Sequence, residues 1–365
     1  VHAMVADEAS REILITDIFT AFGQRTGGQE IVLQPVPVQW GEWSQRCAGL
    51  ATHPAVLESR DHWLSDASAV DLRLPLTDAA DAPTAGDLVR LSSVLSVAET
   101  SEVDDVRRSR GITVEEVLLA ALGRAIAGSA GSGVVAVDLG GPGRSVLRPD
   151  VDLGRTVGSF TTVYPVSLRC ASADELGAQE LLDGVHEMVE AVPHYGIGYG
   201  LLRYLYAPTA RAFASIRPAD IAFTYAGTIP DMSAFASDEA PVQFDTDAES
   251  PVRESIPGLG HAVELRVYRS RGQLRVDWWY DARRIDGSAA QALADLVEQV
   301  PSTAAFPDRL WLALSAYNLG MGHFRGARAM ERGRLAAGGT RTEGCVDCGP
   351  APRQRHNPTC AGTIG

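Results

Sequence analysis

Apolar positions in the first part of the chain predict a strand, a turn and then an amphipathic helix. Apolar residues alternate at Val1, Ala3 and Val5, and residues 7–10 are typical of a turn. The next apolar residues recur at helical spacing and share one face, and they are Ile13, Leu14, Ile18 and Phe22. We therefore expect a strand that leads into a helix.

Two further helical stretches follow. Their apolar markers are Trp40, Trp43, Leu50, Trp63 and Leu64. The pair His53-Pro54 interrupts them, because proline cannot sit inside a helix without breaking a backbone hydrogen bond. The sequence thus predicts two helices with a break at the proline.

Beyond residue 86, strand patterns and helix patterns alternate, which predicts an α/β layer. Strands are expected at 87–97, 134–139, 161–168 and 221–225, and helices at 174–192 and 288–300. Thr113 and Glu116 form a capping box for a helix with one apolar face, made of Val117, Leu118, Leu122 and Ile126. Alternating segments at 264–269 and 273–280 flank Ser270-Arg271-Gly272 and predict a hairpin.

Composition divides the chain and limits its functions. Residues 78–86 are acidic and rich in alanine and proline, as in a linker, so we predict a first lobe at 1–77, a second lobe at 87–300 and a tail of uncertain origin at 301–365. The net charge of -14 disfavours a nucleic-acid partner. Without an apolar run long enough for a membrane span or a recognisable secretory signal, the sequence predicts a cytoplasmic protein with no membrane partner.

Several segments together carry a family resemblance. They are HAMVADEA at 2–9, GRTVGSFTTVYPVSL at 154–168, GIGYGLLRYL at 196–205, IAFTYAG at 221–227 and the hairpin at 264–281. The first resembles the HHxxxDG corner of nonribosomal peptide synthetase condensation and epimerization domains. The segments at 154–168 and 196–205 resemble the epimerization branch best, and the last two resemble a strand and the late hairpin of the same family. The resemblance implies an α/β, chloramphenicol-acetyltransferase-like fold of two lobes with a tunnel between them, in which the N-terminal lobe is incomplete here.

The resemblance also implies a proton-transfer chemistry that this sequence does not support. Epimerization of a thioester-bound residue needs acid/base groups on both faces of Cα, and the family uses the second His of HHxxxDG and the first Glu of a later turn. These positions are Ala3 and Gly140 here. His2, in the first His position, is the remaining catalytic candidate, although a scaffold role fits it better. We therefore expect an epimerization or condensation domain that is catalytically impaired.

Other residues receive structural or binding roles from the resemblance. Asp7 and Arg144 are expected to form a structural ion pair, and Tyr199 and His261 to line the tunnel. The substrate would be an aminoacyl or peptidyl thioester on the phosphopantetheine of a peptidyl carrier protein, with other synthetase modules as further partners and no cofactor bound by the chain. The alternative is a noncatalytic platform that recruits carrier proteins or tailoring enzymes.

The tail suggests two further hypotheses. Residues 307–330 resemble part of a lytic transglycosylase, through Tyr317, Asn318, Gly320, Gly322 and His323, but no catalytic glutamate accompanies them. A peptidoglycan-acting protein is thus an alternative. The spacing of Cys345, Cys348, His356 and Cys360 fits a zinc ligand set, but no strands are predicted to present these ligands. An unstructured or misjoined tail is the favoured interpretation, and we expect no metal.

Overall fold

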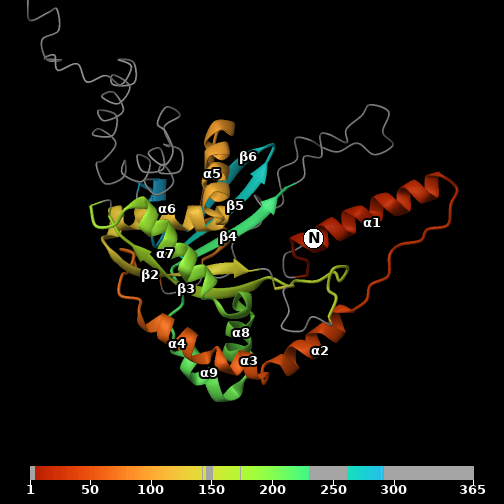
Figure 1. Ribbon diagram of the computed structural model, residues 1–365, viewed down its shortest axis with the longest axis horizontal. Helices are drawn as coiled ribbons and strands as arrows, with labels where there is room; N and C mark the ends of the chain where they lie inside the picture. The colour runs from red at the N-terminus through yellow and green to blue at the C-terminus, as the bar shows by residue number, and fades with distance from the viewer. Residues whose placement is uncertain are drawn as a thin grey trace, which may run out of the picture. The chain divides into compact units, whose positions relative to one another are not determined.

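The computed structural model describes residues 5–79, 81, 83–141, 143–144, 151–172, 174–229, 261–288 and 290–291. Their centre is a six-stranded mixed sheet (Figure 1). In spatial order its strands are β1 (Leu88–Val94), β6 (Gln273–Asp281), β5 (Val263–Ser270), β4 (Ile221–Thr228), β2 (Gly133–Gly141) and β3 (Thr162–Cys170). The β2–β4 and β4–β5 pairs are parallel, and the remaining pairs are antiparallel.

Helices surround this sheet. The upper group in Figure 1 comprises α5 (Val97–Arg110), α6 (Val114–Ala130) and α7 (Ala178–Glu190). The lower group comprises α2 (Trp40–Leu50), α3 (Pro54–Glu58), α4 (Arg60–Ser68), α8 (Ile197–Gly200) and α9 (Ala207–Ala214). Short helical turns at Pro193–Gly196 and Leu201–Leu205 flank α8, and α1 (Glu8–Thr26) precedes them all. All of the described residues belong to one compact unit.

Most predicted elements of the sheet and its helices are present. The capping box at Thr113 and Glu116 starts α6, whose four predicted apolar residues are all buried. Arg271 and Gly272 have positive φ angles in the predicted hairpin, as a two-residue turn between twisted strands requires. Pro54 occupies the first turn of α3, so the break before it also occurs as expected.

Two local expectations differ from the structure. Helix α5 was not predicted, because its sequence DDVRRSR is charged and only a few apolar residues mark its buried side. On α1 the predicted apolar face is only partly buried, since Ile13 is 9% exposed whereas Ile18 is 64% exposed. Most of the predicted strand at 1–5 and of the helix at 288–300 lies outside the described residues.

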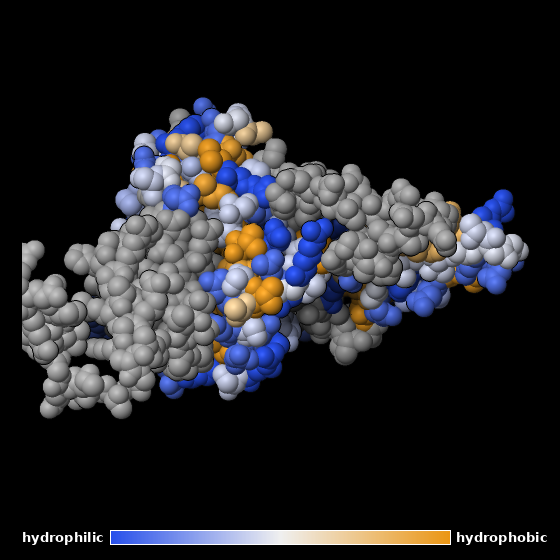
Figure 2. All heavy atoms as spheres, turned by 90° about the horizontal axis from the view of Figure 1, so that it is seen from above, coloured by the Kyte–Doolittle hydropathy of each residue, from blue (hydrophilic) through white to orange (hydrophobic). Residues whose placement is uncertain are grey.

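The core joins the first 77 residues to the sheet. The indole ring of Trp63 on α4 is fully buried, and its centroid lies 6.0 Å from the ring centroid of Tyr164 on β3. The backbone N–H groups of Asp71 and Leu72 donate to the carbonyl of Val134 on β2. From above, orange hydrophobic patches alternate with blue hydrophilic ones over the middle of the described surface (Figure 2). No helix among the described residues is both long and apolar enough to cross a membrane.

Candidate functional site

The start of α1 forms a hydrogen-bonded corner with the loops after β2. Asp7 is the N-cap of α1 and accepts a hydrogen bond from the backbone N–H of Ser10, at 2.8 Å. Its carboxylate also accepts two bonds from Arg144, from Nε to Oδ2 and from Nη2 to Oδ1, both 2.8 Å long. The structure thus brings the predicted pair together in a bidentate geometry, which fixes both the distance and the orientation of the two groups.

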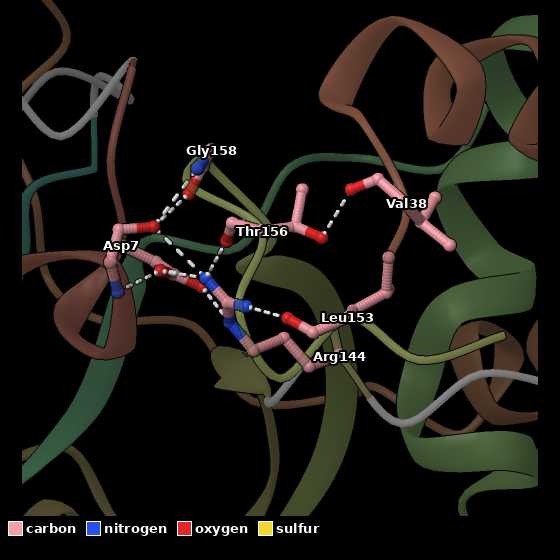
Figure 3. A network of polar contacts seen from close by, with 7 residues as sticks. Asp7, Val38, Arg144, Leu153, Thr156 and Gly158 are labelled. Atoms are coloured by element: carbon pink, nitrogen blue, oxygen red, sulfur yellow. Dashed lines mark hydrogen bonds and ion pairs between the residues drawn. The ribbon is translucent and has the colours of Figure 1, made fainter. Parts of the chain in front are cut away.

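The guanidinium of Arg144 binds more than Asp7 (Figure 3). It donates to the carbonyl oxygens of Leu153 and Thr156 and to the hydroxyl of Ser10. Its Cζ atom also lies 4.2 Å from the ring centroid of Phe160, in a cation–π contact. One arginine therefore ties α1 to the loop at 153–160, a role that lysine with its single ammonium could not fill.

Gly158 forms the second attachment of this corner (Figure 3). Its carbonyl accepts from the N–H of Asp7 and the hydroxyl of Ser10, and its own N–H donates to the same hydroxyl, each at 2.9 Å. A Cβ atom at Gly158 would lie 2.1 Å from Cε3 of Trp40, so the indole ring leaves room only for glycine. The loop is thus packed as well as hydrogen-bonded.

The electrostatics of the corner favour a fixed ion pair. Side-chain exposure is 18% for Arg144 and 10% for Asp7. Burial by itself would raise the pKa of Asp7, but the hydrogen bonds from Arg144 and Ser10 and the positive charge of Arg144 lower it overall. An ionised carboxylate held by several donors serves as a structural anchor and not as a proton acceptor.

The two positions expected to carry acid/base groups are Ala3 and Gly140, and neither residue has a titratable side chain. Gly140 lies near the end of β2, where a Cβ atom would be 3.0 Å from Oγ1 of Thr224 on β4. A side chain at position 140 would therefore crowd the side chain of Thr224. His2 and Ala3 lie outside the described residues, so their placement stays a prediction.

His261 is in a buried charge network that the sequence did not reveal. Its Nε2 atom lies 2.8 Å from Oδ2 of Asp138, and its Nδ1 atom lies 3.5 Å from Oε1 of Glu264. The imidazole is 4% exposed. Desolvation opposes the charged form, but the two carboxylates outweigh it and raise the pKa of His261 to about 9. The isolated aspartate within an apolar strand was the available signal for this contact.

Tyr199, the other predicted tunnel residue, packs among aromatic side chains. Its ring centroid lies 5.4 Å from that of Trp63 and 5.7 Å from that of Phe213. Its hydroxyl accepts a hydrogen bond from Nη1 of Arg203, at 2.8 Å. Burial raises the pKa of the Tyr199 phenol. The structure does not bring Tyr199 into the Asp7–Arg144 corner.

Other candidate sites lie elsewhere. A cavity of about 390 Å³ is lined by residues of α4, α9, β2 and β3, among them Asp66 and Ser167, and by the segment after α9, which includes Arg217; neither Asp7 nor Arg144 lines it. No cluster suited to a metal ion occurs in the part of the chain that the structure describes. The cysteine and histidine set of the tail and the segment resembling a lytic transglycosylase both lie outside the described residues.

Sequence comparison finds relatives among known synthases. The chain is 58% identical over 297 residues to a phenolphthiocerol/phthiocerol polyketide synthase subunit of Mycobacterium tuberculosis. That match covers 80% of the chain and 20% of the relative, so the chain spans about a fifth of its length. A linear gramicidin synthase subunit of Brevibacillus parabrevis is 31% identical over 300 residues, with 80% of the chain and 6% of the relative covered.

Solved structures share the fold. The epimerization domain from the third module of tyrocidine synthetase B matches with a TM-score of 0.69 and 24% identity, over 87% of this chain and 68% of that one. The X-domain from teicoplanin biosynthesis matches with a TM-score of 0.57 and 18% identity, over 81% and 66% respectively. These matches confirm the predicted α/β, chloramphenicol-acetyltransferase-like fold. The family model of the condensation domain matches residues 1–302, and the chain therefore belongs to the condensation-domain family.

Proposed function

We propose that this chain is a condensation-type domain that binds a carrier-tethered acyl thioester and does not epimerize it. The observation that carries the proposal is an intact Asp7–Arg144 corner in a chain with glycine at position 140, where an added Cβ would lie 3.0 Å from Oγ1 of Thr224. Returning a proton to either face of Cα needs acid/base groups on both faces, and glycine provides none.

The relatives support an acyl chain as the tethered group. The relative that is 58% identical is named a polyketide synthase, whereas the linear gramicidin synthase relative is 31% identical. A polyketide chain carries no α-amino group, so a domain for such a substrate has no use for amino-acid epimerization. The proposed partners are carrier-protein domains and neighbouring synthase modules. The proposed domain holds no cofactor of its own, because the pantetheine arm belongs to the carrier.

Hydrogen exchange at Cα tests the absence of epimerization. A carrier domain loaded with an aminoacyl or an acyl thioester is incubated with the chain in D₂O, and α-deuterium is measured by mass spectrometry. We expect no exchange above that of the carrier alone, while the epimerization domain of tyrocidine synthetase B serves as the positive control. Exchange at a rate similar to this control would falsify the proposal.

Binding is measured separately, by calorimetry with an acyl-pantetheine thioester. Detectable binding without exchange is the expected result. Failure to bind either thioester would contradict the binding half of the proposal.

A substitution at Gly140 tests whether Thr224 closes the position. Gly140→Glu alone is expected to leave exchange absent and to lower stability by about 1–3 kcal/mol, since its Cβ would meet Thr224 at 3.0 Å. Thr224→Ala in the same chain should recover part of this loss. Additive effects of the two substitutions, measured by urea unfolding, would show that Thr224 does not occupy the space.

The platform alternative shares the expectation of no exchange but differs in its partner. Under it, the chain would bind a carrier protein or a tailoring enzyme without contacting the tethered acyl group. Equal affinity for a carrier with and without its acyl chain would favour this alternative.

A further inference from the structure

The turn before α8 has an unusual backbone. His194 and Tyr195 have φ angles of 50° and 53°, and Gly196 follows with a φ of 80°. This left-handed conformation is unfavourable for residues that carry a Cβ atom. Among the described residues, Arg271 is the only other non-glycine with positive φ, and its hairpin turn with Gly272 requires that conformation. No hairpin explains the turn at His194.

Packing holds this turn in place. The hydroxyl of Thr162 donates a hydrogen bond to the carbonyl of Tyr195, at 3.3 Å. The ring of Tyr164 lies so close to Gly196 that a Cβ atom there would be 1.8 Å from Cδ1. Strained backbone that the surrounding structure enforces in this way is concentrated at functional sites.

The turn lies at the end of β2 that leads to the candidate site. A Cβ atom at Gly141 would come within 3.1 Å of the carbonyl oxygen of Tyr195. Gly141 directly follows Gly140, and Arg144 of the corner is three residues further along the chain. The strained turn and the corner are therefore attached to the same end of one strand.

Both side chains of the turn are available to a ligand. His194 is exposed, and Tyr195 is 64% exposed. The other histidines with described side chains all have partners, which are Ala55 for His53, Trp63 for His62, Glu116 for His186 and Asp138 for His261. In the same part of the chain, the imidazole of His194 has no hydrogen bond, ion pair or ring contact, and only its backbone carbonyl accepts a hydrogen bond, from the N–H of Ile197. An imidazole that can donate or accept a hydrogen bond is thus held at this edge without a protein partner.

We infer that the turn at His194 and Tyr195 is part of the ligand-binding edge of the domain, where the imidazole of His194 donates a hydrogen bond to a carbonyl oxygen of the tethered acyl chain. This inference rests on the proposed function and adds a binding residue to it. It explains why an unfavourable backbone conformation is retained at an exposed position, although the imidazole of His194 packs against no other side chain.

The test uses S-octanoyl-pantetheine as the probe and calorimetry of the full chain. His194→Gln keeps a polar side chain but changes its geometry, and we expect binding to weaken about tenfold, as for the loss of one hydrogen bond. His186→Gln is the matched control on α7 and should bind like the unmodified chain.

A second pair of variants separates strain from binding. His194→Gly and Arg271→Gly both relieve a positive φ, so each should raise the melting temperature by a few degrees. Only His194→Gly should also weaken binding of the probe. Unchanged affinity in both His194 variants would overturn this inference and leave the proposed function intact. Failure of the unmodified chain to bind the probe would overturn this inference together with the binding half of the proposed function.

Discussion

At the residue scale, the two buried polar pairs differ in how far the sequence alone predicts them. Asp7 and Arg144 form a bidentate pair that the family resemblance anticipates, because both positions belong to sequence motifs. Asp138 and His261 are 123 residues apart in the chain, and the polar Asp138 within an apolar strand indicates a buried partner without identifying it as His261. Only the sheet, which places β2 two strands from β5, brings these side chains within hydrogen-bond distance.

The Asp7–Arg144 pair is expected to contribute strongly to stability. Arg144→Met leaves the carboxylate of Asp7 buried without its counter-charge, and we expect the free energy of unfolding to fall by about 3–5 kcal/mol. Urea unfolding at neutral pH measures this change. Because the pKa of Asp7 is lowered in the folded state, the contribution is present above the unfolded value of 3.8 and is lost as pH falls through the folded value.

An exposed ion pair provides the control for this measurement. Asp105 and Arg108 on α5 both have side chains that are 59% exposed. Arg108→Met should change the free energy of unfolding by no more than about 1 kcal/mol. Equal losses in the two variants would contradict a special role for the buried pair.

His261 predicts a pH dependence on the alkaline side. Its pKa is about 9 in the folded state against an ordinary value of 6.5, so its stabilising contribution is complete below pH 6.5 and is lost as pH rises through 9. The charged and titratable neighbours are Asp138, Glu264 and Arg266. We expect the unmodified chain to lose a few kcal/mol of unfolding free energy over this range.

The comparison is His261→Gln, in which this loss should be absent. Urea unfolding at several pH values between 6 and 10 provides the measurement. His53→Gln, which removes a histidine from the N-cap of α3, should keep the alkaline loss. If the unfolding free energy depends on pH in the same way with and without His261, the charged network is not the cause of the alkaline loss.

At the element scale, local signals located most helices and strands. The capping box of α6 and the hairpin of β5 and β6 follow from residues a few positions apart, and such interactions can be recognised in a sequence. Helix α5 also begins with a capping box, formed by Ser96 and Glu99, which apolar spacing alone does not reveal. Its charged second half weakens the hydrophobic period, so the cap was the better signal there.

The loop at 156–160 should be intolerant of a larger residue at Gly158. A Cβ atom in Gly158→Ala would lie 2.1 Å from the indole ring of Trp40, so we expect a loss of about 1–3 kcal/mol in unfolding free energy. Gly23→Ala is the control, because Gly23 lies inside α1 with no atom within 4 Å of the added Cβ. That substitution should stabilise the helix by up to about 1 kcal/mol. A neutral Gly158→Ala variant would show that Trp40 moves freely.

At the scale of the whole molecule, α1 presents apolar side chains that the sheet does not cover. Ile15, Ile18 and Phe19 are 43%, 64% and 37% exposed and lie at helical spacing. Apolar groups exposed together bind hydrophobic dyes. We expect strong fluorescence of anilinonaphthalene sulfonate with the folded chain, and a marked decrease for Ile15→Lys combined with Ile18→Glu.

Val97 on α5 allows a matched control for the dye measurement. It is 65% exposed, close to the value for Ile18. Val97→Lys should leave most of the fluorescence unchanged, since it does not alter the stripe on α1. Equal decreases in fluorescence in the α1 variant and in Val97→Lys would show that the dye does not bind specifically to α1.

The sequence by itself determined the local elements and the absence of acid/base side chains at Ala3 and Gly140, because residue identity and short-range spacing are properties of the chain. The tertiary structure decided the strand order, the burial of His261 beside Asp138, the close approach of Thr224 to Gly140 and the position of the strained turn at His194. These features join residues that are far apart in the chain, and their pairing depends on the free energy of packing the whole sheet with its helices.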